Sequence, residues 1–165
     1  MAVWYVFQGL NFALEEQGGF LWAPAAGPTG ARVPHWANVG RVRAGDVIYS
    51  ARRKVIAHVL VAQADAGPAH RPPPPYPQVA GQSNDGNLVR VSFFELSRPY
   101  LSHGKIAAEC LDLFSGPGRP LDVNGDGRQG YLFELDESAA DYLRRVTWRG
   151  QSEAISAAVE RARRG

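Results

Sequence analysis

The residues with the clearest potential for metal chemistry lie in the stretch DVNGDGRQGYLFEL, residues 122–135. Its first six residues match the start of a calcium loop, which needs oxygen ligands at positions 1, 3 and 5, glycine at 6 and a bidentate acid at 12. Asp122, Asn124 and Asp126 supply the first three, but position 12 is a phenylalanine and Glu134 follows one place late. We therefore expect a glycine-containing turn that leads into a strand, and no metal site.

Residues suited to catalysis are not grouped by spacing. The chain has no G-x-S-x-G motif and no phosphate-binding P-loop, and Cys110 sits within an apolar helical pattern, where packing in the core is its default role. The four histidines are His35, His58, His70 and His103. Their spacing does not match a metal-binding motif. The sequence predicts a binding protein without a cofactor, rather than an enzyme.

Aromatic side chains stand close to polar and basic residues. Trp22, Trp36 and Tyr49 fall at or near expected junctions between loops and strands, and the segment HWANV places His35 and Asn38 beside Trp36. Nucleic-acid binding uses aromatic faces to stack on bases and amides to read base edges. Packing in the core is the alternative interpretation, and for Trp22 and Trp36 the two interpretations carry equal weight.

The basic residues are unevenly distributed. The formal net charge is +2, yet Arg52, Arg53 and Lys54 follow one another between two apolar runs. Such a cluster on a nearly neutral chain suits an anionic partner. The plainer alternative is a solvated loop tip.

These residues need a scaffold of short strands. The expected strands are residues 3–7, 46–51, 55–62, 87–96 and 131–135. The expected helices are residues 102–114, 136–146 and 152–164. Residues 65–86, with four consecutive prolines, predict a surface loop. Together they predict an α+β fold, a small and strongly curved mixed sheet or barrel with helices at its margins.

Length and composition bound the class of protein. A chain of 165 residues with 45% hydrophobic and 21% charged residues suits one globular domain. No apolar run approaches the roughly 20 residues of a membrane helix, and the N-terminus lacks the basic residues of a signal peptide. One cysteine excludes a disulfide framework. We expect a cytoplasmic protein without a membrane partner.

The order of several segments is similar to a known family. WYVFQG, GGFLWAP, HWANVGRVRAGDVIYSARRKVIAHVLVA, LVRVSFFEL and GRQGYLFEL follow one another as in the EVE-type domain of the PUA-like superfamily, which is related to YTH domains. More closely, they resemble the N-terminal domain that reads modified bases in EVE–HNH restriction endonucleases. The resemblance runs from about Val3 to about Val146. It implies a barrel-like curved sheet with a pocket for a flipped, modified base, a modified cytosine such as 5-methylcytosine, in double-stranded DNA.

The resemblance also implies which residues line the pocket. The pocket residues would be Trp22, Trp36, Asn38, Tyr49 and Ser50. The residues at the rim or against the DNA backbone would be His35, Arg52, Arg53, Lys54, Arg128 and Gln129. We expect Trp36 to stack on the base and Asn38 or Ser50 to hydrogen-bond its edge. Asp122 and Asp126 should point away from the bound strand, and Arg128 toward it.

The chain departs from the endonucleases because no HNH segment follows. We expect a modified-base-binding domain over residues 1–150 and a C-terminal helix over residues 151–165. Either this helix links to a nuclease domain outside this chain in a restriction–modification system, or the chain is a stand-alone reader. Three alternatives stay open. They are an RNA-binding PUA-like domain, a nucleotide or modified-base hydrolase that uses Asp122 or Asp126, and a domain stabilised by calcium.

Overall fold

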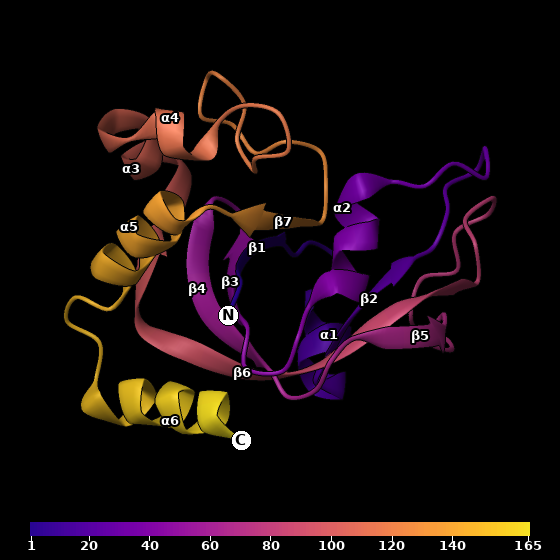
Figure 1. The fold of residues 1–165 in the computed structure, drawn as a ribbon, viewed down its shortest axis with the longest axis horizontal. Coiled ribbons are helices and arrows are strands. Elements are labelled where there is room, and N and C mark those ends of the chain that lie inside the picture. The colour runs from indigo at the N-terminus through magenta and orange to yellow at the C-terminus, as the bar shows by residue number, and fades with distance from the viewer.

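A curled, mixed β-sheet forms the centre of the protein (Figure 1). The computed structural model describes residues 1–165, except for the side chain of Ser102. Within these residues the strands are β1 (Val3–Phe7), β2 (Phe20–Pro24), β3 (Val47–Arg52), β4 (Val55–Ala62), β5 (Gly67–His70), β6 (Asp85–Leu101) and β7 (Leu132–Leu135). Their order is β2-β6-β4-β3-β1-β7, with β5 paired to β6. β1 and β3 run parallel, and their other pairings are antiparallel. The expected α+β class with a curved mixed sheet is confirmed.

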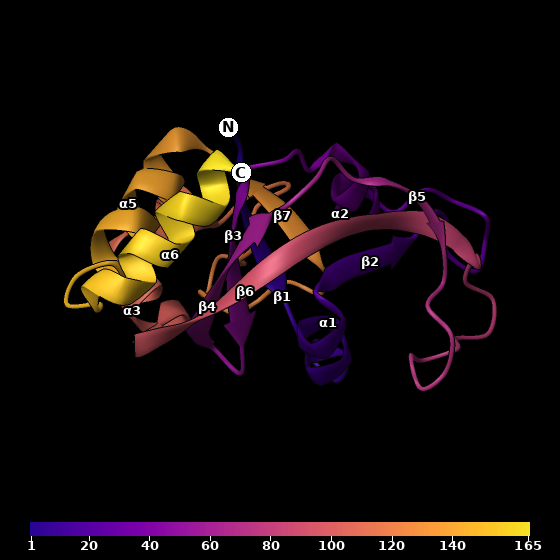
Figure 2. The ribbon, with the colours of Figure 1, turned by 90° about the horizontal axis from the view of Figure 1, so that it is seen from below.

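Short helices cover both ends of this sheet. They are α1 (Phe12–Gly18), α2 (Pro34–Ala37), the 3₁₀ helix η1 (Asn38–Arg41), α3 (Ser102–Glu109), α4 (Leu111–Phe114), α5 (Glu137–Thr147) and α6 (Glu153–Arg164). In Figure 1, α3 to α6 gather on one side of β3 and β4, whereas α1, α2, β2 and β5 lie on the other side. The long strand β6 sweeps past both groups (Figure 2).

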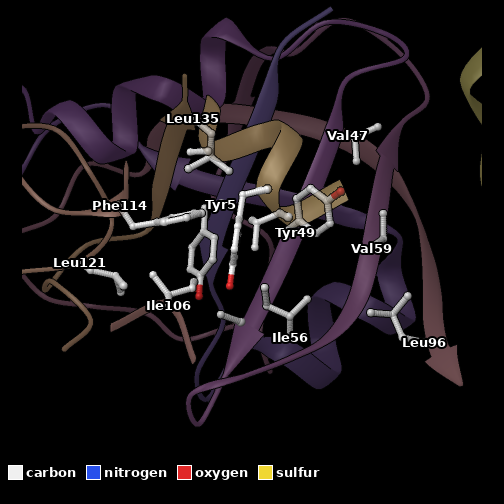
Figure 3. Packing of buried hydrophobic residues seen from close by; sticks show 14 of the residues in the cluster. Tyr5, Val47, Tyr49, Ile56, Val59, Leu96, Ile106, Phe114, Leu121 and Leu135 are labelled. Carbon is white, nitrogen blue, oxygen red and sulfur yellow. The ribbon is translucent and has the colours of Figure 1, made fainter. Parts of the chain in front are cut away.

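The side of the sheet beneath α3 to α6 holds one hydrophobic core. Tyr5, Tyr49 and Ile56 from the strands pack there with Ile106 and Phe114 from the helices (Figure 3). Helix α6 belongs to this core, since its Val159 is 2% exposed. The segment 151–165 therefore packs against the domain.

The other side of the sheet holds a second core. Trp4, Leu21, Ile48 and Leu132 are buried there. Successive side chains of a strand face opposite sides, so Ile48 enters this core while its neighbour Tyr49 enters the other. This alternation decides which residues of β3 can reach a site on either side.

Several elements begin and end where the sequence predicts. Asp136 caps α5 by accepting a hydrogen bond from the Ala139 N–H at 2.9 Å, and Ser152 caps α6 in the same way. Two strands, β2 and β5, were not expected. The helix expected over residues 102–114 is split into α3 and α4 at Cys110, whose backbone leaves the helical region.

The expected basic hairpin is present. Arg52 pairs with Val55 across β3 and β4, so Arg53 and Lys54 form the two-residue turn. Both have positive φ, 50° and 66°. Asn and Gly are the residues favoured in such a turn, and a larger side chain is strained there. Figure 2 shows the turn, α1 and the loop after β5 projecting toward the same edge of the molecule.

Across the described residues, the helices are too short or too polar to cross a membrane.

Candidate functional site

An aromatic cavity of about 160 Å³ lies between β2, α2, the start of α1 and the loop after β5. The structure brings Trp22 and Trp36, two of the residues predicted for a pocket, together in its lining with Tyr76 and Tyr131. The remaining lining residues are Asn11, Ala23, Pro24, Arg71, Pro77, Val79 and Gln82. We call this space the aromatic cavity.

The two tryptophans differ in burial. Trp22 is 3% exposed, and its indole N–H donates to the Ala69 carbonyl oxygen at 3.2 Å. The Trp22 ring packs so closely on Gly86 that a Cβ there would lie 2.8 Å from it. Trp36 is only half-buried on the short helix α2. Trp22 therefore forms a fixed wall of the cavity, and Trp36 offers a more accessible face.

Arg71 holds the loop after β5 in place. It is 9% exposed, and its guanidinium lies 4.8 Å from the centroid of the Trp22 ring. The guanidinium donates to the Pro77 and Ser83 carbonyls at 3.1 and 3.0 Å, and to Asn84 and Gln82 side chains at 3.3 Å. All four acceptors are neutral oxygens. The positive charge of Arg71 is therefore hydrogen-bonded beside the cavity but is not neutralised by a carboxylate among these acceptors.

The loop brings Tyr76 onto a buried carboxyl group. Glu15 of α1 is 0% exposed, and its Oε1 accepts hydrogen bonds from the hydroxyls of Tyr131 at 2.6 Å and Tyr76 at 3.2 Å. Its Oε2 accepts from the Gln8 amide at 2.7 Å, and Gln8 in turn accepts from the Ser50 hydroxyl at 2.5 Å. The network joins α1, β1, β3 and the loop beneath the aromatic cavity.

Burial sets the protonation of this network. Desolvation raises the pKa of Glu15 from 4.5 to about 7, and the hydrogen bonds from Tyr131, Gln8 and Tyr76 oppose this rise. Desolvation also raises the pKa of Tyr131 well above its ordinary value, and the neighbouring Glu15 charge adds to the rise. Glu15 therefore changes its protonation near neutral pH, whereas the Tyr131 hydroxyl keeps its proton.

Three residues expected in the pocket lie elsewhere. Tyr49 is 2% exposed in the core under α5 (Figure 3). It also lines a different cavity of about 600 Å³ between the N-terminus, α5 and α6. It faces away from the aromatic cavity because of the alternation along β3. Asn38 donates its amide to the Leu132 carbonyl at 2.9 Å, so it links η1 to β7. Ser50 is buried below the cavity, and hydrogen bonds through Gln8 and Glu15 connect it to the lining.

The rim expected around His35 and the turn before β7 is present in part. The Tyr131 backbone N–H donates to Nδ1 of His35 at 3.2 Å, and burial lowers the pKa of His35, so this imidazole is neutral near pH 7. Gln129 is exposed. Arg128 is half-buried, and its Nε donates to the Leu121 carbonyl at 2.9 Å. The Arg128 side chain is thus held on its own loop rather than extended toward a ligand.

The basic turn adjoins α1, and the residue just before this helix lines the cavity. The Arg52 guanidinium lies 4.9 Å from the centroid of the Phe12 ring, and Asn11 of the cavity directly precedes Phe12. Arg53 is exposed at the tip. Lys54 Nζ lies 3.1 Å from a carboxylate oxygen of Asp126. Asp126 was expected to point away from bound DNA, but it stands beside one of the predicted backbone contacts and partly offsets its charge.

The half calcium motif forms a turn. An Asp122 carboxylate oxygen accepts the backbone N–H groups of Asn124 and Asp126 at 2.8 and 3.0 Å, which organises the loop without a metal. Glu134 pairs instead with Arg41. In the part of the chain that the structure describes, no group of three or more His, Cys, Asp or Glu side chains is arranged to hold a metal ion.

Sequence reasoning missed most of the polar residues around the cavity. They are Asn11, Glu15, Arg71, Tyr76 and Tyr131. One available signal was Tyr76, an aromatic residue that follows four prolines in a long loop. Glu15 gave no such signal, because the adjacent pair Glu15 and Glu16 forms a pattern typical of a solvated helix surface.

Comparisons with known proteins support the fold. The sequence matches no protein-family model, and a search of curated proteins finds no related sequence. A crystal structure of a Pseudomonas putida protein superposes with a TM-score of 0.58 at 11% identity, over 88% of this chain and 99% of that one. An NMR structure from Rhodopseudomonas palustris has a TM-score of 0.54 at 13% identity, over 92% and 97% of the two chains. At such identities these likenesses concern the fold alone.

Proposed function

We propose that this chain is an EVE-type reader of modified DNA, a binding module rather than an enzyme. It takes a modified base, a modified cytosine such as 5-methylcytosine, from a duplex into the aromatic cavity. Arg52, Arg53 and Lys54 hold the DNA backbone beside it. The observation that carries the proposal is the aromatic cavity, in which Trp22, Trp36, Tyr76 and Tyr131 meet.

The size and chemistry of the cavity support a single flat ring as its occupant. Its 160 Å³ is smaller than the about 300–1,000 Å³ of pockets for drug-sized ligands. Base flipping costs a few kcal/mol, which stacking on aromatic faces at about 1–3 kcal/mol per base can offset. Trp36 is the accessible face for such stacking, and Asn11 and Gln82 provide amides at the cavity wall.

The charge of the lining favours a nucleobase over a methylated amine. Aromatic cavities also bind quaternary ammonium groups, which need a negative or neutral surrounding. Here the buried Arg71 guanidinium lies against the Trp22 ring in the lining. The Arg71 charge disfavours a cationic ligand and does not oppose a neutral base attached to an anionic backbone; the carboxyl group of Glu15 below the cavity, when ionised, partly offsets this charge.

The test is a binding panel, which measures the affinity of the protein for one duplex that carries different base modifications at one position. Its central base is cytosine, 5-methylcytosine or 5-hydroxymethylcytosine, with N6-methyladenine in a matched adenine site. We expect tighter binding to a modified cytosine than to cytosine, and loss of that preference in Trp36→Ala. Trp148→Ala serves as the matched control, since Trp148 is also half-buried but lines the other cavity.

Two outcomes would redirect the proposal. Equal affinity for all the duplexes would contradict modified-base reading. Tighter binding of single-stranded RNA than of any duplex would favour the RNA-binding alternative instead.

A further inference from the structure

Asn11 stands where a helix cap would be, yet its side chain is used differently. It directly precedes α1, and asparagine is favoured at that position because its side-chain oxygen accepts a backbone N–H of the first turn. No such bond forms here. Instead Nδ2 of Asn11 donates to the Tyr76 hydroxyl at 3.3 Å, and the half-buried side chain lines the aromatic cavity. The amide is therefore available to a ligand.

The carboxyl group below decides which way this amide points. An ionised carboxylate only accepts hydrogen bonds, and a tyrosine hydroxyl has one proton to donate. Tyr76 gives its proton to Glu15 Oε1, as does Tyr131. The Tyr76 oxygen can then only accept from Asn11, which directs Nδ2 toward it. Oδ1, an acceptor, is the end of the amide left for an occupant.

The carboxylate is itself fixed from the far side. Gln8 donates its amide to Glu15 Oε2 at 2.7 Å, and the Gln8 oxygen accepts from Ser50 at 2.5 Å. Ser50, Gln8 and Glu15 are each at most 4% exposed. Water therefore does not compete for these bonds. Ser50 donates to Gln8, and Gln8, Tyr76 and Tyr131 donate to Glu15.

We infer that Asn11 reads the edge of the bound base and selects a base with an exocyclic amine, a cytosine or adenine type, over one with a keto oxygen at the same place. The inference rests on the proposed function and adds its specificity. An amine donates to Oδ1 of Asn11, whereas a keto oxygen would face that acceptor without a hydrogen between them. Leaving a buried acceptor without its donor discriminates by about 10- to 100-fold.

The experiment compares 5-methylcytosine with thymine in one duplex, each opposite an abasic site. Both carry the same methyl group, and neither has a pairing partner to lose on flipping. We expect the wild-type protein to bind the 5-methylcytosine duplex at least about tenfold more tightly. Asn11→Ala should reduce the ratio toward one, and so should Tyr76→Phe, which removes the hydroxyl that orients the amide. Gln17→Ala, at an exposed position of α1, should leave the ratio unchanged.

The result that would overturn the inference is thymine binding as tightly as 5-methylcytosine, or a ratio that survives both Asn11→Ala and Tyr76→Phe in folded proteins. Circular dichroism and melting curves establish folding, and Asn11→Ser replaces Asn11→Ala if the latter unfolds. The same preparations are tested on 5-methylcytosine and cytosine, each paired with guanine. If the protein prefers 5-methylcytosine over cytosine but not over thymine, the role of Asn11 is contradicted and the proposed function is not. If it shows neither preference, the proposed function is contradicted.

Discussion

The Tyr131 hydroxyl donates to Oε1 of Glu15 across 2.6 Å, and so joins the turn before β7 to helix α1 beneath the aromatic cavity. The two residues are 116 positions apart in the chain. Glu15 is 0% exposed, and its carboxyl group collects donors from three segments. This contact couples the shape of the cavity to the protonation of one buried acid.

The stability of the protein should depend on pH through Glu15. Its pKa is raised from 4.5 to about 7, so between these values the folded protein binds a proton that the unfolded chain has released. The free energy of unfolding should therefore fall as pH rises through this window, by about 3 kcal/mol in total. Urea unfolding at several pH values measures it. Glu15→Gln should flatten this part of the profile, and Glu95→Gln, exposed on β6, should not.

The amino-over-keto preference should weaken below pH 7. Protonated Glu15 can donate to the Tyr76 hydroxyl, and Tyr76 can then donate its own proton to Asn11. The orientation of the Asn11 amide is then no longer fixed, so Oδ1 is not reserved for the base. The groups facing the carboxyl are Tyr131, Tyr76 and Gln8, with the Arg71 charge acting on Tyr76. The 5-methylcytosine to thymine affinity ratio, measured from about pH 6 to pH 8, should rise with pH. A flat ratio in the wild-type protein would contradict the coupling.

Replacing Trp22 should mainly reduce stability, whereas replacing Trp36 should mainly reduce binding. Trp22→Ala removes a side chain that is 3% exposed and should destabilise the fold by about 3–5 kcal/mol. Trp36→Ala removes a half-buried side chain from a four-residue helix and should cost much less stability. Thermal melting and the binding panel, run on both variants, check this. A Trp36 variant as unstable as the Trp22 variant would mean that Trp36 is mainly a core residue.

Asn and Gly substitutions in the basic turn should increase the stability of the protein and weaken its binding to DNA. Replacing Arg53 by Asn and Lys54 by Gly relieves two positive-φ positions and should stabilise the protein by about 1 kcal/mol. The same change should weaken all duplexes alike and lower the salt dependence of binding by about 0.9 for each phosphate that is no longer neutralised. Arg53→Gln with Lys54→Gln is the matched control. It should weaken binding to the same degree without the gain in stability.

Arg71 should be needed for the loop that carries Tyr76. Arg71→Lys keeps the charge but loses the planar fork that reaches several carbonyls. We expect faster proteolysis within residues 71–85 and weaker binding of the modified duplex. Arg32→Lys, at an exposed loop position, is the control and should change neither. Unchanged proteolysis in Arg71→Lys would show that the loop is held by its other contacts.

Local patterns predicted the strands with apolar or alternating residues and the capped helices. β3 and β4 were predicted because two apolar runs flank three charged residues, and α5 because a helical pattern has acids in its first turn and arginines in its last. β2 and β5 were missed. β2 ends in proline, and β5 has glycine and proline at its start. They are strands because each pairs with an edge of β6. These partners are distant in the chain, so a short stretch of sequence does not reveal the pairing.

The sequence by itself determined the class of fold and the basic turn, and it left Trp22 and Trp36 equally balanced between a pocket and the core. Only the tertiary structure decided that Tyr49 faces another core and that Asn11, Glu15 and Tyr76 meet. The first set depends on neighbours in the chain, through strand alternation, turn residues and charge. The second depends on the path of the loop after β5, which returns over α1 and brings a tyrosine 61 positions away onto a buried carboxyl group.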